Sequence, residues 1–190
     1  MKNFKKCIEE SNLAKLSLIK KKNQIDTTIK LISNSIQKGG TLFICGNGGS
    51  AADAQHLAAE FIVRLRPHVN RNPLPALSLA LDTSTLTACG NDYSFDEIFS
   101  RSLEGLSKNK NDMLLAITTS GNSRNILNVL KTAKAKNLKT IGFLGNDGGL
   151  CKDFCDYPLL VAHKNTARIQ EAHIFLGHYI FEMVEDIIIN

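Results

Sequence analysis

The amino-acid sequence predicts an α/β fold in which helices cover both faces of a mainly parallel, five-stranded sheet. Two observations lead to this prediction. Short apolar runs alternate with longer helical stretches along the chain, which is typical of strands connected in parallel by helices. Glycines or hydroxyl residues follow directly after several of the apolar runs, at the points where a strand turns into a helix. In open parallel sheets these are the positions where ligands bind.

From the N-terminus, isoleucines at helical spacing predict a helix over residues 25–36, and the pair Gly39–Gly40 ends it. The apolar run 42–45 is expected to be a buried strand. A helix is predicted at about 50–64, after the glycines that follow this strand. A loop with three prolines then leads to a second strand at 76–81.

The second half of the chain continues the alternation. A helix is expected at 95–106, a third strand at 113–117, a helix at 123–136 and a fourth strand at 139–144. The remaining predicted elements are a short helix at 150–154, a fifth strand at 159–162 and a long helix at 166–188.

The long last helix is nearly apolar on every side. Its large apolar residues are Ile169, Ile174, Phe175, Leu176, Ile180, Phe181, Met183, Val184, Ile187 and Ile188. One face of a sheet cannot cover all of these side chains, so we expect a partner subunit to cover the rest.

Length and composition fit one domain. The chain has 190 residues, of which 43% are apolar and 22% charged. We therefore expect a single domain over 1–190, with 1–40 as an N-terminal helical segment. No secretory signal and no run of roughly 20 apolar residues is present. Five scattered cysteines indicate reduced thiols, so the sequence predicts a cytoplasmic protein without membrane contact.

Charge and cysteine spacing each leave an alternative open. The net charge is +5, and lysines concentrate near the N-terminus. A solvated helix face is the simpler interpretation, because the chain has no tryptophan and matches no nucleic-acid motif. A positive field could also attract an anionic small substrate. Cys151 and Cys155 resemble half of a zinc site, but no second pair exists and buried thiols are commoner.

A glycine loop, Gly46–Ala51, follows the first strand. Its glycines let the backbone approach a ligand, and the next helix offers free N–H groups there. The run fits the dinucleotide pattern G-x-G-x-x-A, but the acid expected about 20 residues later is absent, so no nucleotide cofactor is predicted. A purely structural turn is the other alternative.

A hydroxyl loop, Thr118–Ser123, occupies the equivalent position after the third strand. Hydroxyls, a glycine and a helix start can hold a phosphate without a cation. An ordinary serine-capped turn would have the same appearance. The presence of two such loops favours a phosphorylated ligand with a polar body.

Two helices carry side chains suited to chemistry. His56 and Glu60 lie one turn apart, so they share a face that could bind a metal or exchange protons; a plain surface pair is the alternative. Gln170 and His178 lie eight residues apart on the last helix, a rise of about 12 Å. Neighbouring subunits would make it easier for one ion to reach both.

Six motifs together carry a resemblance to a known family. They are Cys45–Ser50, Asp53–His56 with Glu60, Gly90–Asp92, Thr119–Ser123, Gly145–Gly149, and Arg168–Glu171 with His178. In order and spacing they resemble the phosphoheptose isomerases, which have the sugar-isomerase (SIS) fold, a three-layer αβα sandwich. The resemblance covers nearly the whole chain. It implies a homotetramer with active sites between subunits.

The resemblance also implies an activity: conversion of D-sedoheptulose 7-phosphate to D-glycero-D-manno-heptose 7-phosphate, the first step towards activated heptose for lipopolysaccharide or capsule. It implies that zinc, one per subunit, is held by His56, Glu60, Gln170 and His178, of which Glu60 and His178 also form the acid–base pair. The implied substrate contacts, beyond Glu60 and Gln170, are Asn47, Gly48, Gly49, Asn91, Asp92, Thr118, Thr119, Ser120 and Ser123.

One departure and two alternatives accompany the resemblance. Some family members have aspartate where this chain has Ala167. Any help that this carboxylate gives to opening of the sugar ring must here come from elsewhere, such as Asp92 or water. A sibling of the family is a non-catalytic adaptor of the replication initiator. It lacks the acid at Glu60 and the last-helix histidine, and has arginine at Ser120, whereas this chain keeps all three isomerase residues. The second alternative is an isomerase of another sugar phosphate.

Overall fold

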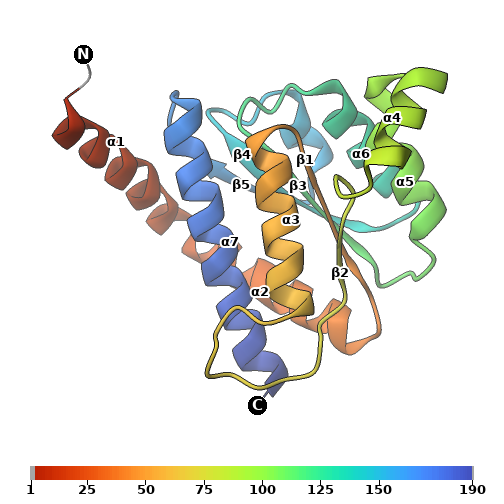
Figure 1. Cartoon of the computed structure of the whole chain (residues 1–190). Coiled ribbons are helices and arrows are strands. Elements are labelled where there is room, and N and C mark those ends of the chain that lie inside the picture. Colours follow the sequence, from red (N-terminus) through yellow and green to blue (C-terminus); the bar gives the residue numbers. More distant parts are fainter. Residues whose placement is uncertain (1–2, 190) are drawn as a thin grey trace.

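The computed structural model describes residues 3–189, and it confirms the predicted fold class (Figure 1). Five parallel strands form one sheet in the order β2-β1-β3-β4-β5. The strands are β1 (Leu42–Gly46), β2 (Ala76–Ser78), β3 (Met113–Thr118), β4 (Lys139–Gly145) and β5 (Tyr157–Val161). Every residue of β1 and β3 is buried, as expected for central strands covered on both faces.

Helices form the two outer layers. The helical elements are α1 (Phe4–Leu16), η1 (Ser17–Lys21), α2 (Lys22–Gln37), α3 (Gly49–Ile62), α4 (Thr83–Asp92), η2 (Phe95–Glu97), α5 (Ile98–Leu106), α6 (Arg124–Ala135), η3 (Leu150–Phe154) and α7 (Thr166–Ile189). Side chains alternate along each strand, so every strand serves two cores. Leu42 and Leu115 pack with α2, α3 and α7 on one face, whereas Phe43 and Leu114 pack with α5 and α6 on the other.

Helix α4 was not predicted, and two neighbouring elements differ from expectation. The segment 83–92 contains three threonines and a glycine, which are weak helix formers. Asp82 starts the helix, because its carboxylate accepts hydrogen bonds from the backbone N–H groups of Ser84 and Thr85. The second strand ends at Ser78 rather than at residue 81. The helix predicted at 95–106 divides into η2 and α5.

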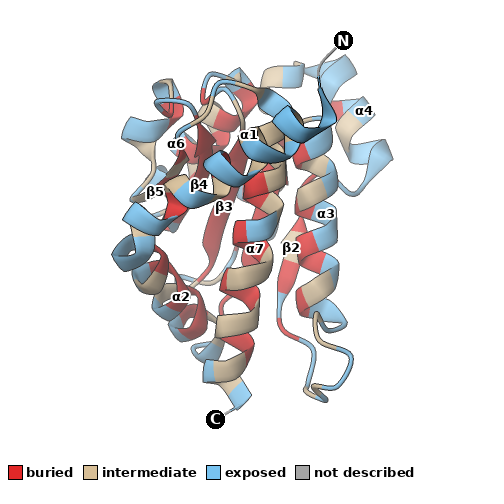
Figure 2. Ribbon diagram, turned by 90° about the vertical axis from the view of Figure 1, so that its left-hand side faces the viewer, coloured by how far each residue is buried: buried red, intermediate tan, exposed pale blue. Residues whose placement is uncertain are grey.

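The last helix is covered more fully by its own chain than the sequence suggested. Helices α1, α2 and α3 all pack against α7. Figure 2 shows the buried stripe that results along α7, beside the largely exposed α1. Among its large apolar side chains, Phe175, Ile187 and Ile189 remain 48%, 41% and 48% exposed. Apolar side chains of α1 and η1 are more exposed: Phe4, Leu13 and Ile19 are 79%, 63% and 68% exposed. No helix within residues 3–189 is long and apolar enough to cross a membrane.

Candidate active site

Three loops lie side by side at the carboxyl edge of the sheet, because β1, β3 and β4 are neighbours. They are the glycine loop after β1, the hydroxyl loop after β3 and the loop at 146–149 after β4. The last two touch through their backbones. A Cβ on Gly121 would lie 2.0 Å from the carbonyl oxygen of Gly148, and Gly121 has a φ of +67°. Only glycine therefore fits at this contact.

The hydroxyl loop has a defined internal structure. Thr118 is buried, and its Oγ1 accepts a hydrogen bond of 3.2 Å from the backbone N–H of Gly121. Ser120 is exposed, and its Oγ accepts one of 3.2 Å from the N–H of Asn122. Ser123 precedes α6 without capping it through its side chain, and its Oγ lies 3.5 Å from that of Thr118. The hydroxyl loop thus gathers the four predicted phosphate residues, which include Thr119, at the start of a helix.

A pair of amides ties the glycine loop to α6. Asn47 and Asn125 exchange two reciprocal side-chain hydrogen bonds of 2.8 Å each. Asn125 is only 2% exposed. The sequence analysis missed this residue, although an asparagine one turn before Val129 on the apolar stripe of a helix was a usable signal. The pair fixes Asn47, a predicted sugar contact, against the helix that follows the hydroxyl loop.

Helices α3 and α7 lie side by side and run in the same direction (Figure 1). Near their N-terminal ends, a Cβ on Gly49 would lie 1.8 Å from Nε2 of Gln170, so this amide rests on the glycine loop. Further along, the rings of Phe61 and Phe181 stack with centroids 3.6 Å apart. Each contact joins residues about 120 positions apart in sequence. The two helices are therefore in register from end to end.

This register brings His56 and Glu60 of α3 to His178 of α7. His56 Nε2 lies 2.8 Å from His178 Nε2 and 3.3 Å from Glu60 Oε1. The three donor atoms lie within 4.8 Å of one another. In the described part of the chain, no other group of three or more His, Cys, Asp or Glu side chains has metal-binding spacing. All five cysteines are free, and Cys151 with Cys155 forms no such group.

The environment of the cluster favours a neutral His178. Burial is the main cause that lowers the pKa of His178, and the nearby His56 lowers it further. Glu60 and Glu182 oppose this shift. A neutral imidazole can accept a proton or bind a metal. Two imidazoles and a carboxylate form a donor set that zinc accepts, and the same groups can move a proton. The residues present therefore fit either use.

Three predicted site residues, Gln170, Asn91 and Asp92, belong neither to this cluster nor to the two loops. Gln170 sits against Gly49, about 12 Å of helical rise before His178. Asn91 and Asp92 are exposed at the end of α4, joined by a side-chain hydrogen bond of 2.8 Å. Helix α4 packs against η2 and α5. A single chain thus unites the His–Glu–His group and, separately, the hydroxyl loop, whereas the side chains of Asn91 and Asp92 bond to each other.

Asp53 is a site residue that sequence reasoning did not single out. It lies on α3 one turn before His56, and its Oδ2 is buried without a hydrogen-bond partner. Burial raises the pKa of Asp53 from 3.8 to about 6, although the charge of His56 pulls it down. A carboxylate kept in such surroundings destabilises the fold when ionised, which indicates a role in the site rather than in stability.

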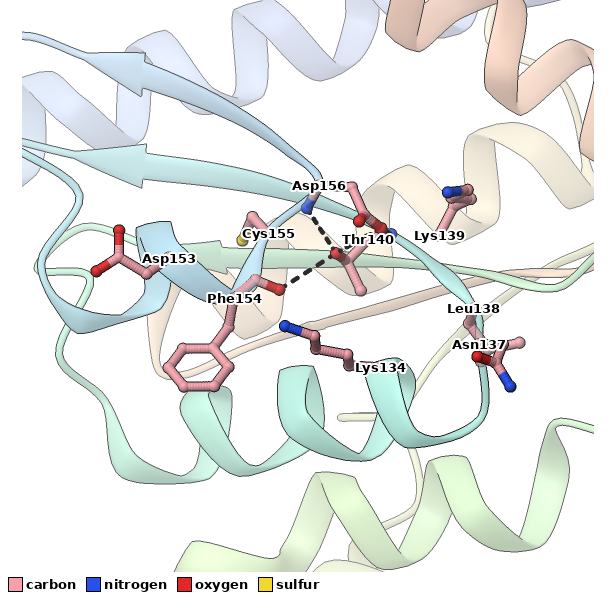
Figure 3. A pocket seen from close by; sticks show the side chains of 9 residues that line it. All are labelled: Lys134, Asn137, Leu138, Lys139, Thr140, Asp153, Phe154, Cys155 and Asp156. Atoms are coloured by element: carbon pink, nitrogen blue, oxygen red, sulfur yellow. Dashed lines mark hydrogen bonds between the residues drawn. The ribbon is translucent and has the colours of Figure 1, made fainter.

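A separate hollow lies far from these residues. Figure 3 shows a cavity of about 250 Å³ lined by Lys134, Lys139, Thr140, Phe154 and Asp156, among others. Lys139 begins β4, so the cavity opens at the amino edge of the sheet. Thr140 is held there by Asp156, whose carboxylate accepts from its backbone N–H at 2.9 Å. This edge lies opposite the three loops, so the cavity takes no part in the candidate site.

Comparisons with known proteins agree with the geometry. The SIS domain family matches residues 10–145. Phosphoheptose isomerase of Clostridium acetobutylicum is 46% identical over 189 residues, which is 97% of this chain and 95% of the relative. The chain belongs to the phosphoheptose isomerase family. Another family member, from a Synechocystis strain, is 53% identical over 161 residues, or 85% of this chain and 81% of the relative.

Solved structures of the family have the same fold. The phosphoheptose isomerase from Francisella tularensis superimposes with a TM-score of 0.90 at 33% identity, covering 96% of each chain. The phosphoheptose isomerase GmhA from Neisseria gonorrhoeae gives 0.87 at 38% identity, covering 94% of this chain and 95% of the other. Family membership thus rests on sequence and structure over nearly the full length.

The raised pKa of Asp53 predicts a pH-dependent effect of its removal. An acid with a higher pKa in the folded state binds its proton more tightly there, so the fold loses stability as pH rises from about 4 to about 6. At pH 7.5, Asp53→Asn should therefore raise the free energy of unfolding by roughly 1 kcal/mol, after allowing for partial exposure, and Tm by about 2–4 °C. At pH 4 it should change Tm hardly at all. Thermal unfolding in chelator would measure both values. Asp153→Asn, at an exposed position, is the control, and an equal gain from Asp53→Asn at both pH values would contradict the prediction.

Proposed function

We propose that this protein is an aldose–ketose isomerase that converts D-sedoheptulose 7-phosphate to D-glycero-D-manno-heptose 7-phosphate. The observation that carries the proposal is the Glu60–His56–His178 cluster in a member of the phosphoheptose isomerase family. The reaction would open the synthesis of nucleotide-activated heptose for lipopolysaccharide core or capsule. We place it in the cytoplasm, which five free cysteines favour.

The reaction moves a proton between two adjacent carbons of an open-chain sugar. Glu60 is suited to take the proton from C1 and return it at C2 through an enediol. Its carboxylate is largely shielded from solvent, with a side-chain exposure of 19%, and it belongs to a rigid helix. His178, whose lowered pKa keeps it neutral, can transfer a hydroxyl proton or steady the developing oxyanion. Acid–base groups of this kind contribute about 10²–10⁴-fold each.

The two loops would bind the substrate. The hydroxyl loop supplies Thr118, Thr119, Ser120 and Ser123 and the start of α6 for the phosphate. Asn47, Gly48, Gly49 and Gln170 would contact the sugar near the glycine loop. Asn47 is oriented for this by Asn125, and Gln170 by its contact with Gly49. No lysine or arginine is needed in this scheme, since hydroxyls and backbone N–H groups act as donors.

We also propose one zinc ion per subunit, held by His56, Glu60, Gln170 and His178. The support is the short spacing of His56, Glu60 and His178. When bound, zinc would polarise a sugar oxygen. Gln170 would have to leave its contact with Gly49, or come from elsewhere in an assembly, to join the other three.

A homotetramer with active sites between subunits completes the proposal. Its support lies in the exposed apolar residues of α1 and η1, and in the exposure of Asn91 and Asp92, which leaves them open to a neighbouring subunit. Light scattering at micromolar concentration should give the mass of four chains. A monomeric mass would contradict the assembly and leave the site without Asn91 and Asp92.

Glu60→Gln tests the isomerase directly. Glutamine keeps the size of the side chain but not its basicity, so the variant should fold and still bind sugar phosphate. Its isomerase rate should fall by about 10²–10⁴-fold. It should also stop exchanging the C1 hydrogen of the substrate with deuterated water, which NMR can follow. Exchange at the wild-type rate would remove Glu60 as the base. No exchange with the wild type would favour the adaptor, and turnover of a different sugar phosphate would favour the other isomerase.

The double variant Ser120→Ala, Ser123→Ala is the matched counterpart to Glu60→Gln. It removes two hydroxyl donors from the phosphate loop and leaves the acid–base cluster intact. Its affinity for sedoheptulose 7-phosphate should weaken by about 1 kcal/mol or more per lost hydrogen bond, measured by calorimetry. Unchanged affinity would place the phosphate elsewhere.

Zinc content provides a separate measurement. His56→Ala removes one of the two imidazoles of the cluster and should lose most of its zinc by elemental analysis. His163→Ala is the control, because His163 hydrogen-bonds locally to the N–H of Asn165. Equal zinc in wild type and His56→Ala would point to a different metal site.

A further inference from the structure

The loop that follows α3 folds back onto the end of that helix through Arg71. This side chain is 3% exposed. Its Nη2 donates to the backbone carbonyl of Glu60, and its Nη1 to that of Phe61, each at 2.8 Å. These carbonyls belong to the last turn of α3, where helical partners are missing. Arg71 therefore holds the backbone of the same residue whose carboxylate faces His56.

The same guanidinium also reaches α7. Its Nε donates to Oε1 of Glu185 at 2.7 Å. Glu185 is completely buried, and its other oxygen accepts from Nε of Arg66 at 3.0 Å. A planar guanidinium has donors on three nitrogens, so it can bind the two carbonyls and the carboxylate at once, whereas an ammonium group donates from a single nitrogen. We call Arg71, Glu185 and the carbonyls of Glu60 and Phe61 the Arg71 clamp.

The Arg71 clamp joins the two helices that carry the active-site cluster. Glu185 lies seven residues after His178 on α7, or about 10.5 Å along the axis. On α7, Phe181 lies between His178 and Glu185, and its ring stacks on that of Phe61, an apolar contact without directional hydrogen bonds to fix the register. A buried ion pair with fixed hydrogen bonds does not tolerate sliding. Such pairs add little net stability, and their best-attested use is to set register.

We propose that Arg71 is a positioning residue that sets the register of α3 against α7 and so holds Glu60 and His178 at their working distance. The role deepens the isomerase activity proposed above and rests on it. A displacement of about 1 Å at a reacting group can lower a rate by about a hundredfold. The hydroxyl loop lies at the other end of α3, so substrate binding depends on the clamp far less than turnover does.

Arg71→Lys tests the role, because lysine keeps the charge and loses the three-way hydrogen bonding. With sedoheptulose 7-phosphate, kcat should fall by about 10–100-fold while KM changes by less than threefold. Assays are run well below the Tm of the variant. If Arg71→Lys does not fold, Glu185→Gln replaces it. Glutamine keeps the size of the side chain and one acceptor oxygen, so this variant should fold, but it loses the ion pair with Arg71, and the same split is expected.

Arg66→Gln is the matched control. Arg66 binds the same carboxylate, Glu185, and also Asp186 and the carbonyl of Glu182, but none of its hydrogen bonds goes to α3. The variant loses a comparable ion pair and keeps the Arg71 clamp, so its kcat should stay within threefold of wild type. An equal loss of kcat in Arg71→Lys and Arg66→Gln would show that Arg71 is only one of several stabilising contacts, and it would overturn the proposal.

A second readout is independent of activity. The chain has five histidines, so protein labelled only at histidine gives few ring resonances, which single substitutions can assign. Arg71→Lys should shift the resonances of His56 and His178 and leave that of the distant His163 in place; Arg66→Gln should leave all three in place. Unshifted His56 and His178 in Arg71→Lys would overturn the clamp. If the wild type neither isomerises nor exchanges the substrate, the proposed function fails, and the NMR comparison still decides the role of Arg71.

Discussion

The parallel packing of α3 against α7 is the constraint on which the rest of the site depends. Contacts at Gly49, Phe61 and the Arg71 clamp keep the two helices in one register from the loop edge to their far ends. This register places the imidazole of His178 against His56. The sheet fixes the other half of the site, because adjacent parallel strands deliver their loops to one edge.

Most of the fold was predictable because its strands are apolar runs and its major helices are periodic. Helix α4 was not, since Asp82 and burial of Cys89 decide it rather than propensity. In the site, the spacing of His56 and Glu60 predicted a shared face. That His178 lies next to them was inferred only from the resemblance, because a sequence separation of 122 residues gives no information about distance in space. Arg71 and Glu185 were missed for the same reason, since each acts through a partner that only the fold supplies; for Asn125 the sequence showed an asparagine on an apolar helix stripe but not its partner Asn47.

The buried polar groups that join α6 and α7 to the loops around the site are paired, whereas one buried oxygen beside the His–Glu–His cluster is not. Glu185 has two arginines, and the amides of Asn47 and Asn125 satisfy each other. The buried oxygen of Asp53, by contrast, has no partner. Stability is given up at the cluster, and the surrounding ion pairs and stacked rings keep the helices rigid enough to tolerate that loss.

The common direction of the helices has an electrostatic consequence. Helices α3, α6 and α7 all begin at the carboxyl edge of the sheet, as the positions of Gly49, Ser123 and Gln170 show. Their dipoles point the same way, so their positive ends converge on the three loops. That field comes from peptide groups and not from side chains. It does not titrate, and no single substitution removes it, so the attraction of this edge for anions persists across the pH range in which His178 and Asp53 change charge.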